Sequence, residues 1–347
     1  MTVILSCVVA AAVCRGLLTA MGRQRAVRLP MDLPSPRGSH ERPTPRVGGM
    51  AIVAGVLAGV GVLTLAGQQL DGAAWLVLGC SLSVATVGLV DDLRGLGVAP
   101  RLLVQGVAAA VVVACLGGVG NLPLPPPADL RFGPAAAWAF SLLWLVGVTN
   151  FFNFMDGIDG LAGGQALITC STLAVVSWGS GDGRLSLLVA APVLVFLLSN
   201  WSPARVFLGD MGSFFLGFFL AASPWIGRQD LREERLLVVA TSLALFLLDP
   251  VWTLLRRFAR GARLTQAHRE HLYQRLTAPP RSHAVVAAGS HAAAIVLSIL
   301  AVVGFRYAAW AWVAPGAALA AFSVELLLVG RSSAPADRAR SSSSAPR

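Results

Sequence analysis

The chain has 347 residues, of which 56% are hydrophobic and 13% are charged, and its mean hydropathy is +0.71. This composition excludes a soluble globular protein, because it leaves too little polar surface to cover a globule of this size in water. All 27 basic residues are arginine and the formal net charge is +10, but no aromatic and basic module accompanies them. We therefore expect an integral membrane protein that contacts phosphates and anionic headgroups, and no nucleic acid.

Apolar stretches long enough to cross a hydrocarbon core of about 30 Å recur along the whole chain. They predict an all-α, polytopic membrane protein with about eleven transmembrane helices. The expected spans are residues 2–20, 47–67, 73–90, 102–119, 135–150, 161–178, 185–199, 213–227, 236–255, 284–304 and 308–330. We expect residues 1–330 to form one transmembrane catalytic domain and the Ser-, Arg- and Pro-rich residues 331–347 to form a disordered cytoplasmic tail.

The arginines concentrate in segments 21–46, 256–283 and 331–347. Because basic residues are retained on the cytoplasmic side of a membrane, this distribution predicts an outside N-terminus and a cytoplasmic C-terminus. The first apolar stretch lacks a basic leader and a small-residue cleavage site, so we interpret it as a permanent helix rather than a secretory signal.

Carboxylates are scarce, and six of the 17 acidic residues fall at the ends of expected spans on the cytoplasmic side. The six are Asp91 and Asp92 in VDDL, Asp156 and Asp159 in NFFNFMDGIDGLAGG, Asp210 in FLGDMGS, and Asp249. Any one of them could simply cap a helix. Together they predict one site, because adjacent aspartates repel each other and need a cation or a basic partner.

Oxygen ligands recur at steps of three in Asn150, Asn153, Asp156 and Asp159. Such a series drifts by about 60° per step around an ideal helix, so the helix must loosen if all four are to face one point. The glycines after the two aspartates allow that. Oxygen ligands without a Cys or His cluster select Mg²⁺, with Mn²⁺ possible, over zinc.

Two basic stretches complete the set. Residues 32–49, DLPSPRGSHERPTPRVGG, form an irregular loop in which Arg37, His40 and Arg46 are candidates for substrate binding or are plain membrane-surface charges.

The second stretch, residues 256–276, holds Arg269, His271 and Arg275 as candidates to grip phosphate oxygens. Helical spacing predicts an ion pair between Asp249 and Arg256. We interpret His283 and His291 as interface and packing residues.

With these blocks assembled, the chain resembles the polyprenyl-phosphate N-acetylhexosamine-1-phosphate transferases of glycosyl transferase family 4. These include phospho-N-acetylmuramoyl-pentapeptide transferase. The match runs from about residue 30 to residue 276 through PTPRVGG, VDDL, NFFNFMDGIDGLAGG, ARVFLGDMGS and LLDPVWTLLRR with HREHLYQRL. The resemblance implies a multi-pass protein of the bacterial inner membrane, with its active site on the cytoplasmic face. It also implies transfer of a sugar 1-phosphate from a UDP-activated N-acetylamino sugar to undecaprenyl phosphate.

The resemblance also implies roles for individual residues. It implies that Asp91 and Asp92 are the paired aspartates, the first handling the acceptor phosphate, and that Asp210 and Asn153 bind Mg²⁺. It places Asp156 and Asp159 beside the donor pyrophosphate and makes His271 the first histidine of a C-terminal signature. Arg101 and Asn150 join the substrate-binding candidates, and a homodimer is a possible assembly.

The C-terminal signature departs from the family pattern, because Tyr273 and Gln274 stand where two further histidines are expected. This departure favours the O-antigen-initiating branch that loads N-acetylfucosamine, N-acetylquinovosamine or a related 6-deoxy-amino sugar. An N-acetylglucosamine-1-phosphate transferase of the same family is the alternative. A membrane transporter is a more distant one, since its carboxylates should lie near the bilayer midplane rather than at one rim.

Overall fold

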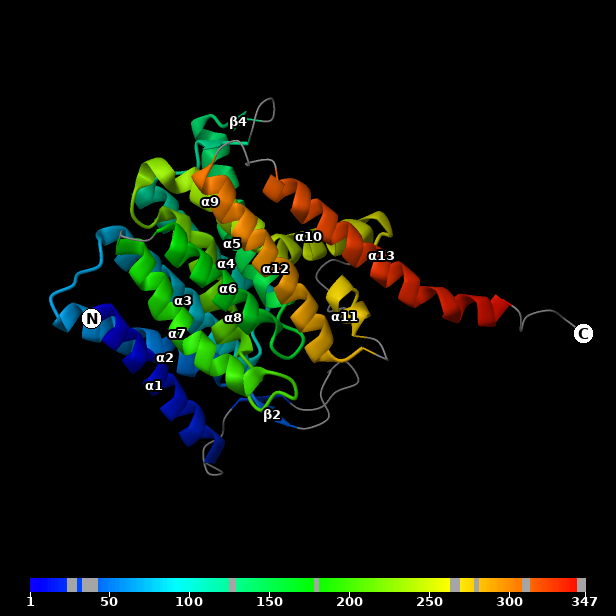
Figure 1. The fold of residues 1–347 in the computed structure, drawn as a ribbon, viewed down its shortest axis with the longest axis horizontal. Coiled ribbons are helices and arrows are strands. Elements are labelled where there is room, and N and C mark those ends of the chain that lie inside the picture. Colours follow the sequence, from blue (N-terminus) through cyan, green and yellow to red (C-terminus); the bar gives the residue numbers. More distant parts are fainter. Residues whose placement is uncertain are drawn as a thin grey trace, which may run out of the picture.

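The computed structural model describes residues 1–23, 30–32, 43–124, 129–177, 181–262, 269–277, 281–307 and 313–341. The fold is all-α, as expected (Figure 1). The helices are α1 (Thr2–Arg23), α2 (Gly48–Leu65), α3 (Gly72–Arg94), α4 (Val98–Leu116), α5 (Pro134–Phe154), α6 (Leu161–Val176), α7 (Gly181–Asn200), α8 (Gly209–Ala222), α9 (Arg232–Ser242), α10 (Ala244–Ala259), α11 (Leu272–Leu276), α12 (His283–Arg306) and α13 (Val313–Ser341).

The remaining regular elements are short. Strand β1 (Met31–Asp32) pairs with β2 (Thr44–Pro45), and β3 (Asn121–Leu122) pairs with β4 (Leu130–Arg131), both antiparallel. Two 3₁₀ turns, Ser223–Trp225 and Gln229–Leu231, join α8 to α9. Helix α13 continues past Gly330 to Ser341, and the expected division into a catalytic domain and a tail stays a prediction.

Each expected span coincides with helical structure, but not every one is a full membrane crossing. In the part of the chain that the structure describes, eight helices are long and apolar enough to span a bilayer, or nine if the bent pair α9 and α10 is one span. Helix α6 has only 16 residues and α8 only 14. The protein is therefore a multi-pass membrane protein, with the orientation expected from its arginines still a prediction.

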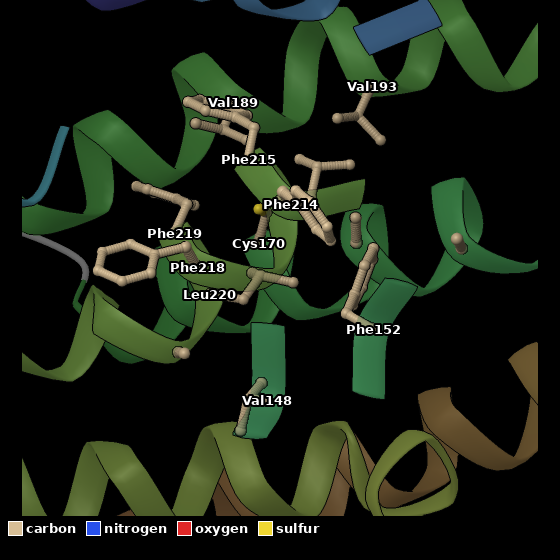
Figure 2. Close-up of a cluster of buried hydrophobic side chains, with 14 of the residues drawn as sticks. Val148, Phe152, Cys170, Val189, Val193, Phe214, Phe215, Phe218, Phe219 and Leu220 are labelled. Carbon is tan, nitrogen blue, oxygen red and sulfur yellow. The ribbon is translucent and has the colours of Figure 1, made fainter. Parts of the chain in front are cut away.

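Helix α8 lies at the centre of the bundle, against α2, α3 and α5. All its residues from Gly212 onward are buried, and its phenylalanines meet side chains of α5, α6 and α7 (Figure 2). A helix enclosed by protein on all sides needs no polar face, which explains its uniformly apolar sequence. Its first turn carries Asp210.

Glycines let α2 and α3 approach the first turn of α8. A Cβ atom at Gly49 would lie 2.3 Å from the backbone nitrogen of Gly212, and one at Gly88 would lie 2.4 Å from the carbonyl oxygen of Asp210. Both distances are far inside van der Waals contact, so no side chain fits at either position. The backbone around Asp210 is thus held on two sides.

The ninth expected span is not one straight helix. Helices α9 and α10 meet at an angle of 71°, next to Leu243. The carbonyl of Ser242, at the end of α9, accepts a hydrogen bond of 2.8 Å from Gln165 Nε2, and the Ser242 hydroxyl contacts those of Thr169 and Ser298. A broken helix leaves polar backbone groups without partners in the helix. Gln165 supplies the partner for one of them, the carbonyl of Ser242.

Candidate functional site

One cavity, of about 280 Å³, collects polar residues from segments far apart in the sequence. Its lining includes six of the residues that the sequence singled out: Arg46, Asn153, Asp156, Asp159, Asp210 and Arg269. We call it the acidic cavity. Arg37 and His40 lie outside the residues that the structure describes.

Asp92 fixes the start of α8 beside this cavity. Its carboxylate accepts hydrogen bonds of 3.0 Å from the backbone nitrogens of both Asp210 and Met211. The negative charge also interacts favourably with the N-terminal end of the helix dipole. Gly209 makes the approach possible, since its φ is +74° and a Cβ there would lie 2.7 Å from Asp92 Oδ2.

Arg46 lies between two carboxylates at the cavity wall. Its Nη2 atom is 2.7 Å from Asp32 Oδ1, and its Nη1 atom is 3.8 Å from Asp92 Oδ1. The guanidinium, about one-third exposed, still faces the cavity. Arg46 thus brings positive charge to the acidic side chains that surround it.

Asn153 joins α5 to α8. Its side-chain nitrogen donates to Asp210 Oδ1 at 2.9 Å and to Ser213 Oγ at 2.8 Å. These two bonds orient the amide, so Oδ1 is the atom that Asn153 could offer to a cation.

Asp156, in the loop after α5, carries a strongly perturbed carboxyl. Desolvation and the negative charge of Asp210 raise the pKa of Asp156 to about 7. Such a cluster of carboxylates is deficient in positive charge, which a divalent cation would supply.

The residues present fit Mg²⁺ as an open site rather than a closed cage. Among the described residues, no three His, Cys, Asp or Glu side chains converge as a complete metal-binding group. Mg²⁺ is commonly held by one or two carboxylates together with substrate phosphates and water. Asp210, Asn153 and Asp156 match that pattern.

Asp159 lines the cavity and is anchored by two contacts with other segments. Its carboxylate accepts a hydrogen bond of 3.1 Å from the backbone nitrogen of Ala204 and lies 3.5 Å from His283 Nδ1. Desolvation alone would raise the pKa of Asp159, but these contacts outweigh it and lower the pKa. The interpretation of His283 as a plain interface residue was therefore incomplete. His291 packs against Trp201 and contacts the carbonyl of Leu161.

Asp91, Arg101 and Asn150 lie outside the cavity lining. Asp91 accepts hydrogen bonds of 2.7 Å from Arg101 Nη1 and 2.5 Å from the backbone nitrogen of Leu96. Asn150 donates to Gln105 Oε1 on α4 at 2.6 Å. The side chains of Asp91 and Arg101 thus bind each other, and that of Asn150 joins α5 to α4.

The expected ion pair between Asp249 and Arg256 is wrong. Asp249 is fully buried and accepts hydrogen bonds from the backbone nitrogens of Leu272, at 2.9 Å, and Tyr273, at 3.1 Å. His271 Nδ1 lies 3.3 Å from the same carboxylate. Buried His271 and Asp249 together fix the start of α11, and His271 does not line the cavity.

Helix α11 reaches the acidic cavity through Gln274. The Tyr273 hydroxyl donates to the carbonyl of Phe154 at 2.9 Å, which ties α11 to the end of α5. Gly157 gives this hydroxyl room, since a Cβ there would lie 2.1 Å from it. Arg275 lies on α11 outside the cavity lining, whereas exposed Arg269 lines it.

Some residues of the cavity carried no signal in the sequence. Asp32 is one, and Asn200 is another: it accepts a hydrogen bond from Gly160 N and donates to the carbonyl of Val206. His283, which the sequence indicated only as an interface residue, lies beside Asp159 without lining the cavity. The packing of α7 and α12 brings Asn200 and His283 to the loop between α5 and α6.

Comparison with known proteins identifies the family of the chain. Residues 74–227 match glycosyl transferase family 4. A probable undecaprenyl-phosphate N-acetylglucosaminyl 1-phosphate transferase from Bacillus subtilis (strain 168) is 29% identical over 293 residues, which cover 83% of this chain and 81% of that protein. The decaprenyl-phosphate N-acetylglucosaminephosphotransferase of Mycobacterium leprae (strain TN) is 31% identical over 289 residues, 72% of this chain and 70% of that protein.

A phospho-N-acetylmuramoyl-pentapeptide-transferase from Lactiplantibacillus plantarum (strain ATCC BAA-793 / NCIMB 8826 / WCFS1) is 32% identical over 205 residues, 53% of this chain and 62% of that protein. The similarity to the mycobacterial protein extends over more than two thirds of both chains. The chain therefore belongs to glycosyl transferase family 4.

Proposed function

We propose that this protein transfers an N-acetylated amino-sugar 1-phosphate from a UDP-sugar to undecaprenyl phosphate. An oxygen of the acceptor phosphate forms a bond to the sugar-bearing phosphorus, and the bond from that phosphorus to the leaving UMP breaks. The products are undecaprenyl-diphosphate sugar and UMP. The names of the relatives support a polyprenyl-phosphate acceptor. The observation that carries the proposal is the meeting of Asn153, Asp156, Asp210, Arg46 and Arg269 around one cavity.

Both substrates are anions, so the site must offset charge and align an oxygen with phosphorus. Arg46 and Arg269 supply positive charge at the cavity wall. Asp210, aided by Asn153 Oδ1 or Asp156, would hold Mg²⁺, with Mn²⁺ as a substitute. When bound, the metal ion neutralises the donor pyrophosphate and stabilises the charge on the leaving UMP.

The paired aspartates are positioning residues in this proposal. Asp92 holds the backbone of Asp210 in place, and Asp91 holds Arg101. A phosphate monoester has a second pKa near 6, so the acceptor has little proton left to remove at pH 7. A dedicated general base is therefore unnecessary.

Two donor classes remain to be compared. The relatives' names favour a UDP-sugar that carries N-acetylglucosamine. Tyr273 and Gln274 favour a 6-deoxy-amino sugar and a role in O-antigen synthesis, because Gln274 lines the cavity where a histidine is expected from the resemblance. Assays with a panel of UDP-amino sugars, on wild type and on Tyr273→His/Gln274→His, separate the two. An unchanged donor preference in the double variant would show that Tyr273 and Gln274 do not determine the donor sugar.

The reaction itself is tested by release of radiolabelled UMP. Purified protein, undecaprenyl phosphate and each UDP-sugar are incubated with Mg²⁺ or with a chelator. We expect UMP and a lipid-linked sugar to appear together, and only with the metal. A protein that moves the substrates across vesicles without releasing UMP would be a transporter, and the proposal would fail.

A further inference from the structure

A second cavity, of about 540 Å³, lies where the C-terminal parts of α1 and α7 meet β2 and the segment after α7. The two helices run side by side at the edge of the bundle (Figure 1). Leu18, Val195 and Leu198 form apolar walls, and two arginines, Arg15 and Arg205, complete the polar part. We call this cavity the arginine groove.

Among the residues that the structure describes, no carboxylate balances the charge of the arginine groove. Neither Arg15 nor Arg205 forms an ion pair with a carboxylate in the described part of the chain, and no Asp or Glu belongs to the described lining. Arg15 is exposed on α1, an apolar helix with little of its surface buried. An arginine on such a helix needs water or an anion at the membrane surface. Its forked donors suit a phosphate group.

The arginine groove and the acidic cavity adjoin at a pair of hydrogen-bonded segments. Phe207 N donates to the carbonyl of Pro45 at 2.9 Å, and Gly48 N donates to the carbonyl of Phe207 at 2.9 Å. Pro45 and Val206 line the groove, whereas their neighbours Arg46 and Phe207 line the acidic cavity. A ligand in the groove would therefore hold the wall that carries Arg46 without touching the substrates.

We propose that the arginine groove binds the phosphate of an anionic membrane phospholipid. The headgroup phosphate lies between Arg15 and Arg205, and an acyl chain follows the apolar wall formed by Leu18, Val195 and Leu198. Charge complementarity and apolar walls on two membrane-spanning helices select a lipid over a soluble anion. Because the segments around Pro45 and Phe207 lie between the groove and the acidic cavity, a phospholipid that does not react fits the groove better than the acceptor does.

Binding is measured on the purified full-length chain in phosphatidylcholine micelles, with and without phosphatidylglycerol. The readouts are the thermal unfolding midpoint and the amount of phosphatidylglycerol retained. For wild type we expect a higher midpoint with phosphatidylglycerol. Arg15→Gln/Arg205→Gln should lower phosphatidylglycerol affinity by roughly tenfold to thirtyfold, because each arginine near a membrane surface adds to the attraction for anionic lipid. These readouts need no turnover, so they can fail or succeed independently of the transferase assay.

The control variant Arg94→Gln/Arg306→Gln removes the same charge from two exposed arginines outside the groove. It should keep the wild-type response. Arg15→Lys/Arg205→Lys guards against a folding defect and should retain part of the affinity. An equal response in Arg15→Gln/Arg205→Gln and in wild type would overturn the proposal. So would stabilisation by inorganic phosphate alone, or by undecaprenyl phosphate but not phosphatidylglycerol.

Discussion

The carboxylate of Asp92 on α3 accepts a hydrogen bond from the backbone nitrogen of Asp210, 118 residues later in the chain. A second bond, from Met211 N, makes Asp92 a cap for α8 that comes from another helix. Because the donors are backbone atoms, the Asp210 side chain remains directed to the acidic cavity. Asp92 thus supports the site through the backbone of α8, although its own side chain does not line the acidic cavity.

Asp92→Asn should lower the rate of UMP release at least tenfold, because the amide cannot accept both backbone hydrogen bonds and loses the charge next to Arg46. The cost in stability should be about 1 kcal/mol. The measurement is turnover together with the thermal midpoint. Asp71→Asn is the matched control, since Asp71 caps α3 by accepting from Ala74 N. Asparagine caps a helix about as well as aspartate, so this variant should keep both stability and turnover, and equal losses of turnover in the two variants would contradict the account.

The pKa of Asp156, raised to about 7, predicts a pH dependence of stability without divalent cations. The folded state keeps this proton to a higher pH than the unfolded state does, so the stabilising contribution is present at low pH. It is lost progressively as pH rises from the ordinary pKa of 3.8 to about 7, and it changes little above that. We expect the midpoint in a chelator to fall over this window, and Asp156→Asn to flatten the fall. In wild type, added Mg²⁺ should reduce the fall of the midpoint. If Asp156→Asn shows the same fall as wild type, another titrating group causes it.

Gly157→Ala should strongly impair activity, because its Cβ would lie 2.1 Å from the Tyr273 hydroxyl. Removing that hydroxyl relieves the clash, so Gly157→Ala/Tyr273→Phe should recover part of the lost turnover. Gly147→Ala, where nothing lies within 4 Å of the added Cβ, is the matched control and should behave as wild type. Failure of the double variant to recover would show that Gly157 is needed for a reason other than the approach of α11.

Gln165→Leu should destabilise the protein by about 1–3 kcal/mol, since the buried carbonyl of Ser242 would lose its hydrogen bond at the break between α9 and α10. Denaturation in mild detergent measures the change. Ser171→Ala, which removes an exposed hydroxyl on the same helix, should have little effect. A Gln165→Leu protein as stable as wild type would mean that the break needs no side-chain partner.

The sequence was most informative where short polar motifs interrupt apolar runs. Asn153, Asp156, Asp159 and Asp210 were predicted to converge, and they line one cavity, because the ends of membrane spans on one side must lie at the same surface. Glycines at 157 and 209 made the close approaches possible, and both lie within those motifs. Local pattern and membrane topology together suffice for this part of the site.

The sequence was least informative about which buried carboxylate pairs with which distant group. Asp249 pairs with α11 and not with Arg256, because Asp249 satisfies backbone nitrogens that no helical spacing predicts. The break at Leu243 has no proline or glycine next to it and depends on Gln165, from another helix. His283 reaches Asp159 only through the packing of α12. The partners of Asp249, Ser242 and Asp159 come from helices distant in sequence, so they depend on how the helices pack.

The central claim is that Asp210 binds the divalent cation on which transfer depends. The most direct test is UMP release as a function of Mg²⁺ concentration for wild type, Asp210→Asn and the exposed control Asp129→Asn, which lies outside the acidic cavity. We predict that Asp210→Asn loses turnover by about a hundredfold or more at every Mg²⁺ concentration, because the metal stabilises the transition state by several kcal/mol. Asp129→Asn should match wild type. Wild-type turnover by Asp210→Asn at saturating Mg²⁺ would contradict the account.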